Sequence, residues 1–267
     1  GRREEAAKYD ALFTKIKAAF NTAYVTPDGK VKGETQTSYL VALHFNLLPP
    51  ALQPLATSHL SNAIAAKNNH LSTGFIGVSY LCPTLTDNGR NDLAYKLLLN
   101  DTFPSWGYSI KQGATTIWER WDGWTQEKGF QDKSMNSFNH YSLGSVGEWL
   151  YGHVAGINTD PEFPGFKRIL IAPHPGPGLR FAKATFNSLH GPIVSDWKIE
   201  NGTTTYNVTI PPNTTAAVTL PDARAAQIHE SGAALSLATK GVSSIRQEGK
   251  NVTVMVGSGT YQFEIQK

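Results

Sequence analysis

The segment GATTIWERWDGW, Gly113 to Trp124, combines residue types that seldom occur together. It places three tryptophans with Glu119, Arg120 and Asp122 within twelve residues. This combination suits a sugar site, because tryptophan offers a flat apolar platform to a pyranose ring and carboxylates accept hydrogen bonds from its hydroxyls. A carboxylate beside such a platform can also act as the base or nucleophile of a glycosidase. The alternative is a loop whose tryptophans fill the gap between two domains, with Glu119 and Arg120 in surface ion pairs. Asp122 could orient the sugar or the base, but we favour an ion pair with Arg120.

Further aromatic residues flank this segment. SWGYS places Trp106 upstream of it, and SFNHYS places His140 downstream, at the expected start of a helix. Trp118 and Trp121 are candidate pocket walls, although two residues three apart on a loop can face different ways. His140 is a candidate partner for a sugar hydroxyl, and the alternative is a helix-start histidine bonded to the backbone.

The rest of the composition argues against other kinds of site. The net charge is +3, from 24 basic and 21 acidic residues without a basic stripe, so we expect no nucleic acid and no membrane as partners. No apolar run approaches the ~18 residues of a membrane helix. The histidines and the single Cys82 lack metal-ligand spacing, and neither a GxSxG motif nor a glycine-rich phosphate loop is present. We therefore expect no metal and no cofactor.

Two features bear on the origin of the chain. It opens with GRREEAAKYD and has no initiator methionine, which predicts processing or a longer parent polypeptide. Thr-rich N-x-[ST] sequons favour an exported protein, secreted or periplasmic, with a cytoplasmic one as the alternative. These sequons begin at Asn100, Asn201, Asn207, Asn213 and Asn251.

Residues 1–157 show the period of helices joined by short turns. Apolar residues of the first helix recur at helical spacing and the helix is expected to stop before the turn Pro27-Asp28-Gly29. The last segment, 137–155, carries Leu143, Val146, Leu150 and Val154 on one face, and its glycines indicate close packing against a neighbour. The apolar residues of the first helix are Tyr9, Leu12, Phe13, Ile16 and Phe20, and the other helices are expected near 36–47, 53–68, 74–82, 91–100 and 137–155.

The composition changes after Ile157. NTDPEFPGF predicts a linker, and the segments that follow alternate apolar with polar residues, which is the period of strands. Asn201-Gly202 lies between two such segments and predicts a tight hairpin turn. We therefore place a second domain at residues 158–267, in which 168–267 form an all-β sandwich.

Three longer segments carry a family resemblance. TGFIGVSYLCPTLTDNGRNDLAYKLLL, PSWGYSIKQGATTIWERWDGW and MNSFNHYSLGSVGEWLYGHVAGI closely resemble the C-terminal part of the bacterial and fungal α-L-rhamnosidases of glycoside hydrolase family 78. IAPHPGPGL, followed by a β-rich tail, resembles the same family. The resemblance is nearly continuous from about residue 36 to about residue 220.

The resemblance implies a fold and an activity. The fold is an (α/α)6 toroid of paired helices followed by a C-terminal β-sandwich, so this chain is expected to be multidomain, α then β. The activity is the inverting hydrolysis of terminal α-L-rhamnosyl residues from a rhamnose-containing glycoside or polysaccharide. The family's general base falls on Glu119 and its ligand-contacting histidine on His140. Trp118 falls on the wall of its aromatic pocket, and Trp106 and His70 are further matches.

One part of the family pattern has no match in this chain. Members are much longer, and their acidic stretch, which carries the general acid, lies before the part matched here. The chain is therefore expected to be the second part of the barrel with the sandwich, and to require the upstream part of the same polypeptide for its general acid. The alternative is a non-catalytic glycan-binding or structural remnant of such an enzyme.

Overall fold

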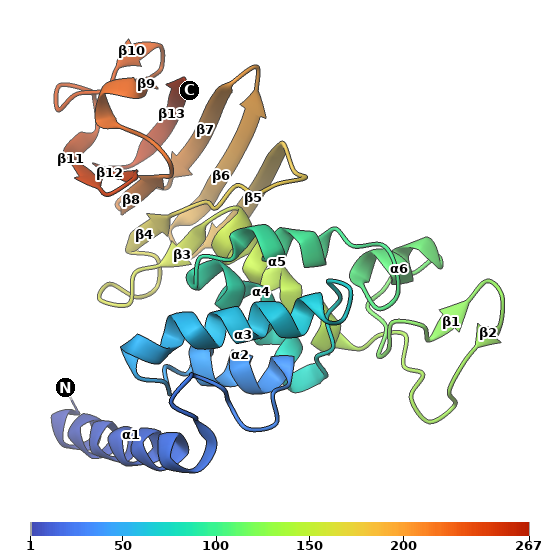
Figure 1. Cartoon of the computed structure of the whole chain (residues 1–267). Helices are drawn as coiled ribbons and strands as arrows, with labels where there is room; N and C mark the ends of the chain where they lie inside the picture. Colours follow the sequence, from blue (N-terminus) through green and yellow to red (C-terminus); the bar gives the residue numbers. More distant parts are fainter. Residues whose placement is uncertain (1, 267) are drawn as a thin grey trace. The chain divides into compact units, whose positions relative to one another are not determined.

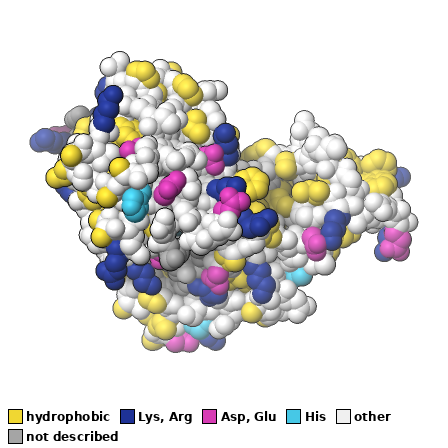
Figure 2. Space-filling view, turned by 90° about the horizontal axis from the view of Figure 1, so that it is seen from above, with side chains coloured by type: hydrophobic (Ala, Val, Ile, Leu, Met, Phe, Trp, Pro, Cys, Tyr) yellow, Lys and Arg dark blue, Asp and Glu magenta, His cyan; other side chains and the backbone are white. Residues whose placement is uncertain are grey.

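The computed structural model describes residues 2–266. The chain divides into two compact units, Gly1–Val146 and Gly147–Lys267, whereas the sequence predicts a boundary between residues 157 and 158. Helices make up most of the first unit and strands most of the second (Figure 1). Among the described residues, no helix combines the length and apolar character needed to cross a membrane. On the face drawn in Figure 2, acidic and basic side chains lie interspersed.

The helices of the first unit match the helical period of the sequence over five segments. Short polar residues begin two of the helices, since Thr35 and Ser38 form a capping box on α2, and the Ser105 hydroxyl accepts a hydrogen bond from Tyr108 N on α6. Helix α6 is too short to reveal its period and was not expected. The helices are α1 Arg3–Tyr24, α2 Gln36–His44, α3 Gln53–Ala65, α4 Phe75–Asp87, α5 Asn91–Leu98 and α6 Trp106–Lys111, with a 3-10 turn at Pro50–Leu52.

Helix α4 forms the centre of this unit. A Cβ placed on Gly77 would lie 2.5 Å from Thr37 Oγ1, so the glycine lets α4 approach α2 closely. Leu81 and Leu85 of α4 are fully buried, as are Leu40 of α2 and Leu60 of α3. This packing fixes the start of α4, which carries Phe75, relative to the rest of the unit.

Helix α1 is amphipathic, as its sequence period predicts, but none of its residues is buried. Asn21 ties it to the unit by donating a hydrogen bond from Nδ2 to Leu47 O at 2.7 Å. Phe20 is half-buried, whereas four large apolar side chains of its first four turns are between 40% and 64% exposed, namely Tyr9, Leu12, Phe13 and Ile16. The apolar face of α1 therefore lacks a partner among the described residues.

The single helix expected at 137–155 is not formed. The segment instead contains a 3-10 turn at Tyr141–Ser145, helix α7 at Val146–Trp149 and a π-turn at Leu150–Val154, which Ala155 N closes on Leu150 O at 2.9 Å. Glycine lowers the helical preference of this segment. Asn158 Nδ2 donates to Gly152 O at 2.6 Å and so satisfies one of the carbonyls that are free at the end of this segment.

Two β-sheets make up the second unit. Buried and exposed residues alternate along their strands, so that each sheet has one buried face. The six-stranded sheet has the order β10-β9-β13-β7-β6-β5 and the five-stranded sheet the order β11-β12-β8-β4-β3, in which only β4 and β8 run parallel. The strands are β3 Ile157–Thr159, β4 Arg168–Ile171, β5 Phe181–Ser188, β6 Gly191–Glu200, β7 Thr203–Ile210, β8 Thr215–Leu220, β9 Ile228–Glu230, β10 Ala233–Ala234, β11 Val242–Glu248, β12 Asn251–Val256 and β13 Gly259–Gln266.

The hairpin predicted at Asn201-Gly202 is confirmed. Glu200 of β6 pairs with Thr203 of β7, and the two turn residues have φ angles of 50° and 79°. Positive φ at both central positions is the requirement of a type I′ turn, which asparagine and glycine meet with little strain. Trp197 of β6 is fully buried, and its Nε1 donates to Val154 O of the π-turn at 2.7 Å.

Candidate functional site

Two loop segments of the first unit are joined by backbone hydrogen bonds at the candidate site. Glu119 N donates to Ser137 O at 2.9 Å, and His140 N donates to Ile117 O at 2.8 Å. Between the two segments, the short hairpin of β1 Trp124–Thr125 and β2 Gly129–Phe130 turns the chain back (Figure 1). Residues 117–119 and 137–140 therefore lie side by side, which brings Glu119 and His140 into one region.

Side chains reinforce this junction. The Thr116 hydroxyl donates a hydrogen bond to Phe138 O, and the rings of Trp118 and Phe138 meet edge to face with centroids 5.2 Å apart. Because edge-to-face aromatic pairs contribute about 0.5–1.5 kcal/mol beyond their buried area, Phe138 helps to fix the indole of Trp118.

Glu119 is half-buried and its carboxylate is oriented by the neighbouring segment. Oε2 accepts a hydrogen bond from Ser137 N at 3.0 Å. Oε1 has no hydrogen-bond partner among residues 2–266. One carboxylate oxygen is thus held in place, while the other remains free to accept a hydrogen bond from a bound water or hydroxyl.

Arg120 does not pair with Glu119 in the described part of the chain. Its guanidinium binds Asp122 through two hydrogen bonds, Nε to Oδ1 at 2.7 Å and Nη2 to Oδ2 at 3.1 Å, and lies 3.6 Å from Asp132. The hydrogen bond to Asp122 is the main reason that the pKa of Arg120 is raised. The expected Arg120–Asp122 pair is confirmed, and the alternative pairing of Glu119 with Arg120 is wrong.

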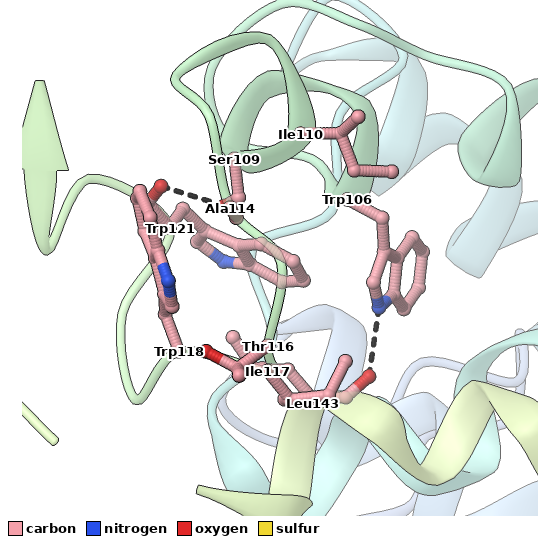
Figure 3. Close-up of a pocket in the computed structure, with 9 residues that line it drawn as sticks. All are labelled: Trp106, Ser109, Ile110, Ala114, Thr116, Ile117, Trp118, Trp121 and Leu143. Carbon is pink, nitrogen blue, oxygen red and sulfur yellow. Dashed lines mark hydrogen bonds between the residues drawn. The ribbon is translucent and has the colours of Figure 1, made fainter. Parts of the chain in front are cut away.

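Three tryptophans line one small pocket of the first unit. Trp118 and Trp121 enter it from the loop and Trp106 from the first turn of α6 (Figure 3). The rings of Trp106 and Trp121 meet edge to face at 5.3 Å. Trp106 Nε1 donates to Leu143 O at 2.7 Å, and Ser109 Oγ donates to Trp121 O at the same distance. The remaining lining residues are mainly apolar and are Ile110, Ala114, Thr116 and Ile117.

The size of this pocket limits what it can hold. Its volume is about 80 Å³, whereas sites for small ligands measure about 300–1,000 Å³. Glu119 and His140 are not among its lining residues. The pocket can accept a small apolar group, and in this chain it does not enclose a whole sugar ring.

His140 is held by both its backbone and its ring. Its Nδ1 accepts a hydrogen bond from Ser142 N at 3.4 Å, so it caps the following 3-10 turn as the backbone-bonded alternative predicts. The ring stacks on Phe75, with centroids 4.6 Å apart and planes 23° from parallel, and on Tyr141 at 5.9 Å and 5°. Among the described residues, Nε2 has no hydrogen-bond partner, so that nitrogen is available to a ligand.

His70 has a different environment. Its Nε2 lies 2.8 Å from Thr102 Oγ1, and its Nδ1 lies 3.0 Å from Asn68 O and 3.2 Å from Lys67 O. Nδ1 therefore braces the turn after α3, and Nε2 joins this turn to the loop before α6. A contact between His70 and a substrate would replace one of these bonds, and that role stays a prediction.

The structure adds Phe75 and Ser137 to the site. Phe75 supports the ring of His140 from the start of α4, and Ser137 N holds the carboxylate of Glu119. No local pattern marks Phe75, because its partner is distant in the sequence. Within residues 2–266, no group of three or more His, Cys, Asp or Glu side chains is placed to hold a metal ion.

Comparison with protein-family models divides the chain between two domains. Residues 1–154 match the bacterial alpha-L-rhamnosidase 6 hairpin glycosidase domain, and residues 156–234 match the bacterial alpha-L-rhamnosidase C-terminal domain. The order of the two matches agrees with the helical and β parts of the structure.

Individual proteins give the same result. An alpha-L-rhamnosidase of Streptomyces avermitilis is 46% identical over 262 residues, which are 98% of this chain and 24% of that protein. An alpha-L-rhamnosidase of Formosa agariphila is 42% identical over 266 residues, which are 99% of this chain and 28% of that protein. The crystal structure of a Streptomyces avermitilis alpha-L-rhamnosidase complexed with L-rhamnose superposes with a TM-score of 0.89, covering 98% of this chain and 24% of that one, at 46% identity. The chain spans about a quarter of the length of these relatives.

Proposed function

The chain belongs to the bacterial α-L-rhamnosidase family, and from this membership we propose that it forms part of an enzyme that hydrolyses terminal non-reducing α-L-rhamnosyl residues with inversion. The substrates are glycosides or polysaccharides that contain rhamnose. The observation that carries the proposal within this chain is the junction of residues 117–119 with 137–140, which places an oriented carboxylate and a histidine in one region.

Glu119 acts as the general base. Ser137 N holds Oε2, so Oε1 accepts a hydrogen bond from the water that attacks the anomeric carbon. As the new bond forms between the water oxygen and this carbon, Glu119 takes a proton from the water, and the bond from the carbon to the leaving oxygen breaks while the general acid protonates that oxygen. In an inverting enzyme the two carboxyl groups stand about 6.5–9.5 Å apart, which leaves room for this water.

The general acid comes from sequence upstream of the matched segments in the same polypeptide. Two observations support a requirement for further chain: the relatives are about four times as long, and the apolar face of α1 is exposed. Further helices of the toroid would cover that face.

His140, Trp118, Trp121, Trp106 and His70 bind the sugar. Nε2 of His140 donates to a hydroxyl, since its Nδ1 already accepts a hydrogen bond from the backbone. The three tryptophans form an apolar wall. A 6-deoxy sugar such as rhamnose presents a methyl group, which needs such a wall, and a small apolar pocket is large enough for a methyl group.

The test is hydrolysis of an aryl α-L-rhamnoside by the complete gene product. Glu119→Gln keeps the shape of the side chain but cannot accept the proton, so we expect kcat to fall by about 10²- to 10⁴-fold. Glu127→Gln is the matched control, because Glu127 is an exposed carboxylate on the hairpin between the two segments, and it should retain full activity. Proton NMR of the first-formed sugar should show β-L-rhamnose.

Two results would contradict the proposal. Full activity of Glu119→Gln would show that Glu119 is not the general base. α-L-rhamnose as the first product would show that the reaction does not proceed with inversion. A complete gene product without activity, which still binds L-rhamnose, would identify the non-catalytic glycan-binding remnant. The 267-residue chain alone should be inactive.

A further inference from the structure

The ring of His140 makes two kinds of contact that fix different degrees of freedom. The hydrogen bond from Ser142 N to Nδ1 determines which edge of the imidazole faces the backbone. In the neutral ring, Nδ1 as acceptor places the proton on Nε2, so that Nε2 is a donor. At 3.4 Å this hydrogen bond is long, and by itself it leaves the plane of the ring weakly held.

Phe75 supplies the missing constraint on the plane. Its ring lies 4.6 Å from that of His140 with an angle of 23° between the planes, closer than the contact with Tyr141 at 5.9 Å. Stacked rings restrict rotation out of their common plane. We propose that Phe75 is a positioning residue, whose stack on His140 directs the Nε2–H bond toward a hydroxyl of the bound sugar.

The backbone beneath Phe75 is suited to this role. Phe75 is the first residue of α4, and Val78 N donates to Gly74 O at 3.0 Å to close the first turn. Two residues later, Gly77 packs against Thr37 of α2 without space for a Cβ. The ring is therefore attached to a fixed helix start, although 37% of the side chain is exposed. The face of the ring that stacks on His140 is thus carried by a helix start that the packing of α4 on α2 holds in place.

The inference rests on the proposed role of His140 in sugar binding, and a double-mutant cycle tests it. In the complete gene product, Phe75→Leu should raise KM for an aryl α-L-rhamnoside and Kd for L-rhamnose by about 2- to 12-fold, the factor that corresponds to one aromatic contact. Phe75→Tyr keeps the ring and should restore both values. In a His140→Ala background, Phe75→Leu should have no further effect, because the ring that it positions is gone.

Phe45→Leu is the matched control. Phe45 is also a partly exposed ring beside a histidine, meeting His44 edge to face at 4.9 Å, but it lies outside the candidate site. It should leave KM and Kd unchanged. Thermal unfolding of every variant separates a loss of binding from a loss of fold.

The outcomes separate this inference from the proposed function. The positioning role alone would be overturned if the enzyme hydrolyses its substrate and Phe75→Leu weakens binding by the same factor with and without His140. An unchanged KM and Kd in Phe75→Leu would also overturn it. Coupling of the two residues in L-rhamnose binding, in a gene product without hydrolase activity, would sustain the positioning role and reject the proposed reaction.

Discussion

Gly156 offers a quantitative test of the packing in the second unit. It has a φ angle of 78°, and a Cβ at this position would come closer than 3.0 Å to backbone atoms of Ala172 and Pro173. The backbones also share a hydrogen bond, from Ala172 N to Gly156 O at 2.8 Å. Gly156→Ala therefore adds a methyl group where neither the local conformation nor the opposite backbone can accommodate it.

A second glycine separates the cost of the left-handed backbone conformation from the cost of the steric overlap. Gly165 has a φ angle of 77° in the same unit, but a Cβ there would meet no atom within 4 Å. Alanine in a left-handed conformation costs about 1–2 kcal/mol, and about 0.4–1 kcal/mol of this is offset because alanine restricts the unfolded chain. We expect Gly165→Ala to lower the free energy of unfolding by about 1 kcal/mol. Overpacking adds about 1–3 kcal/mol, so Gly156→Ala should lower it by about 2–4 kcal/mol.

Scanning calorimetry of the complete gene product measures the difference. At about 4 °C for each kcal/mol in a unit of this size, Tm should fall by about 4 °C in Gly165→Ala and by about 8–16 °C in Gly156→Ala. Because both substitutions lie in the second unit, both should move the same transition. Equal Tm values for the two variants would refute the steric argument and leave only the backbone strain that they share.

Three further predictions concern single side chains. Trp106→Phe removes the donor to Leu143 O and leaves a buried carbonyl without its partner, so thermal unfolding should show a loss of about 1–3 kcal/mol. Burial raises the pKa of the Cys82 thiol to about 12, so its thiolate is scarce at about pH 8, and peptide mass spectrometry should find iodoacetamide on Cys82 only after unfolding. The Arg168 guanidinium holds the pKa of Asp160 in the folded chain below its usual value of 3.8. The pair therefore contributes its full stability above pH 3.8, and this contribution is lost as the pH falls through the lower pKa of the folded state. Tm of Asp160→Asn, measured between about pH 5 and pH 2, should accordingly depend less on pH than Tm of the unmodified protein.

The fold could be predicted wherever local sequence carries the physical cause. The period of apolar residues predicts α1, and Asn201-Gly202 predicts the β6–β7 hairpin, because a type I′ turn needs these residue types. The prediction was wrong for 137–155, where contacts from a distant segment prevent a helix from starting at residue 137: Ser137 O accepts from Glu119 N, and His140 N donates to Ile117 O. Such competition depends on which segments meet in three dimensions and has no local signal.

The candidate site divides in the same way. The sequence marks Trp118, Trp121 and Trp106 as candidates, but a spacing of three residues on a loop does not decide whether Trp118 and Trp121 face the same way, and the structure places all three at one pocket. The contact of Phe75 with His140 could not be predicted, since the ring reaches the site through the packing of α4. Sequence motifs thus mark the candidate groups for chemistry, whose roles stay predictions, whereas the contacts that orient these groups appear only in the structure.

The junction between the two motif segments follows from local geometry. The β1–β2 hairpin turns the chain back between them, with Trp124 opposite Phe130 and Thr125 opposite Gly129. Closing a short loop costs little entropy, and the cost grows only with the logarithm of its length. The hydrogen bonds that join Glu119 to Ser137 and His140 to Ile117 lie within the described chain and need no other part of the toroid. On the proposed mechanism, the half of the site that activates water would therefore be preorganised in this chain, and further helices of the toroid would bring the acid to the opposite side of the sugar.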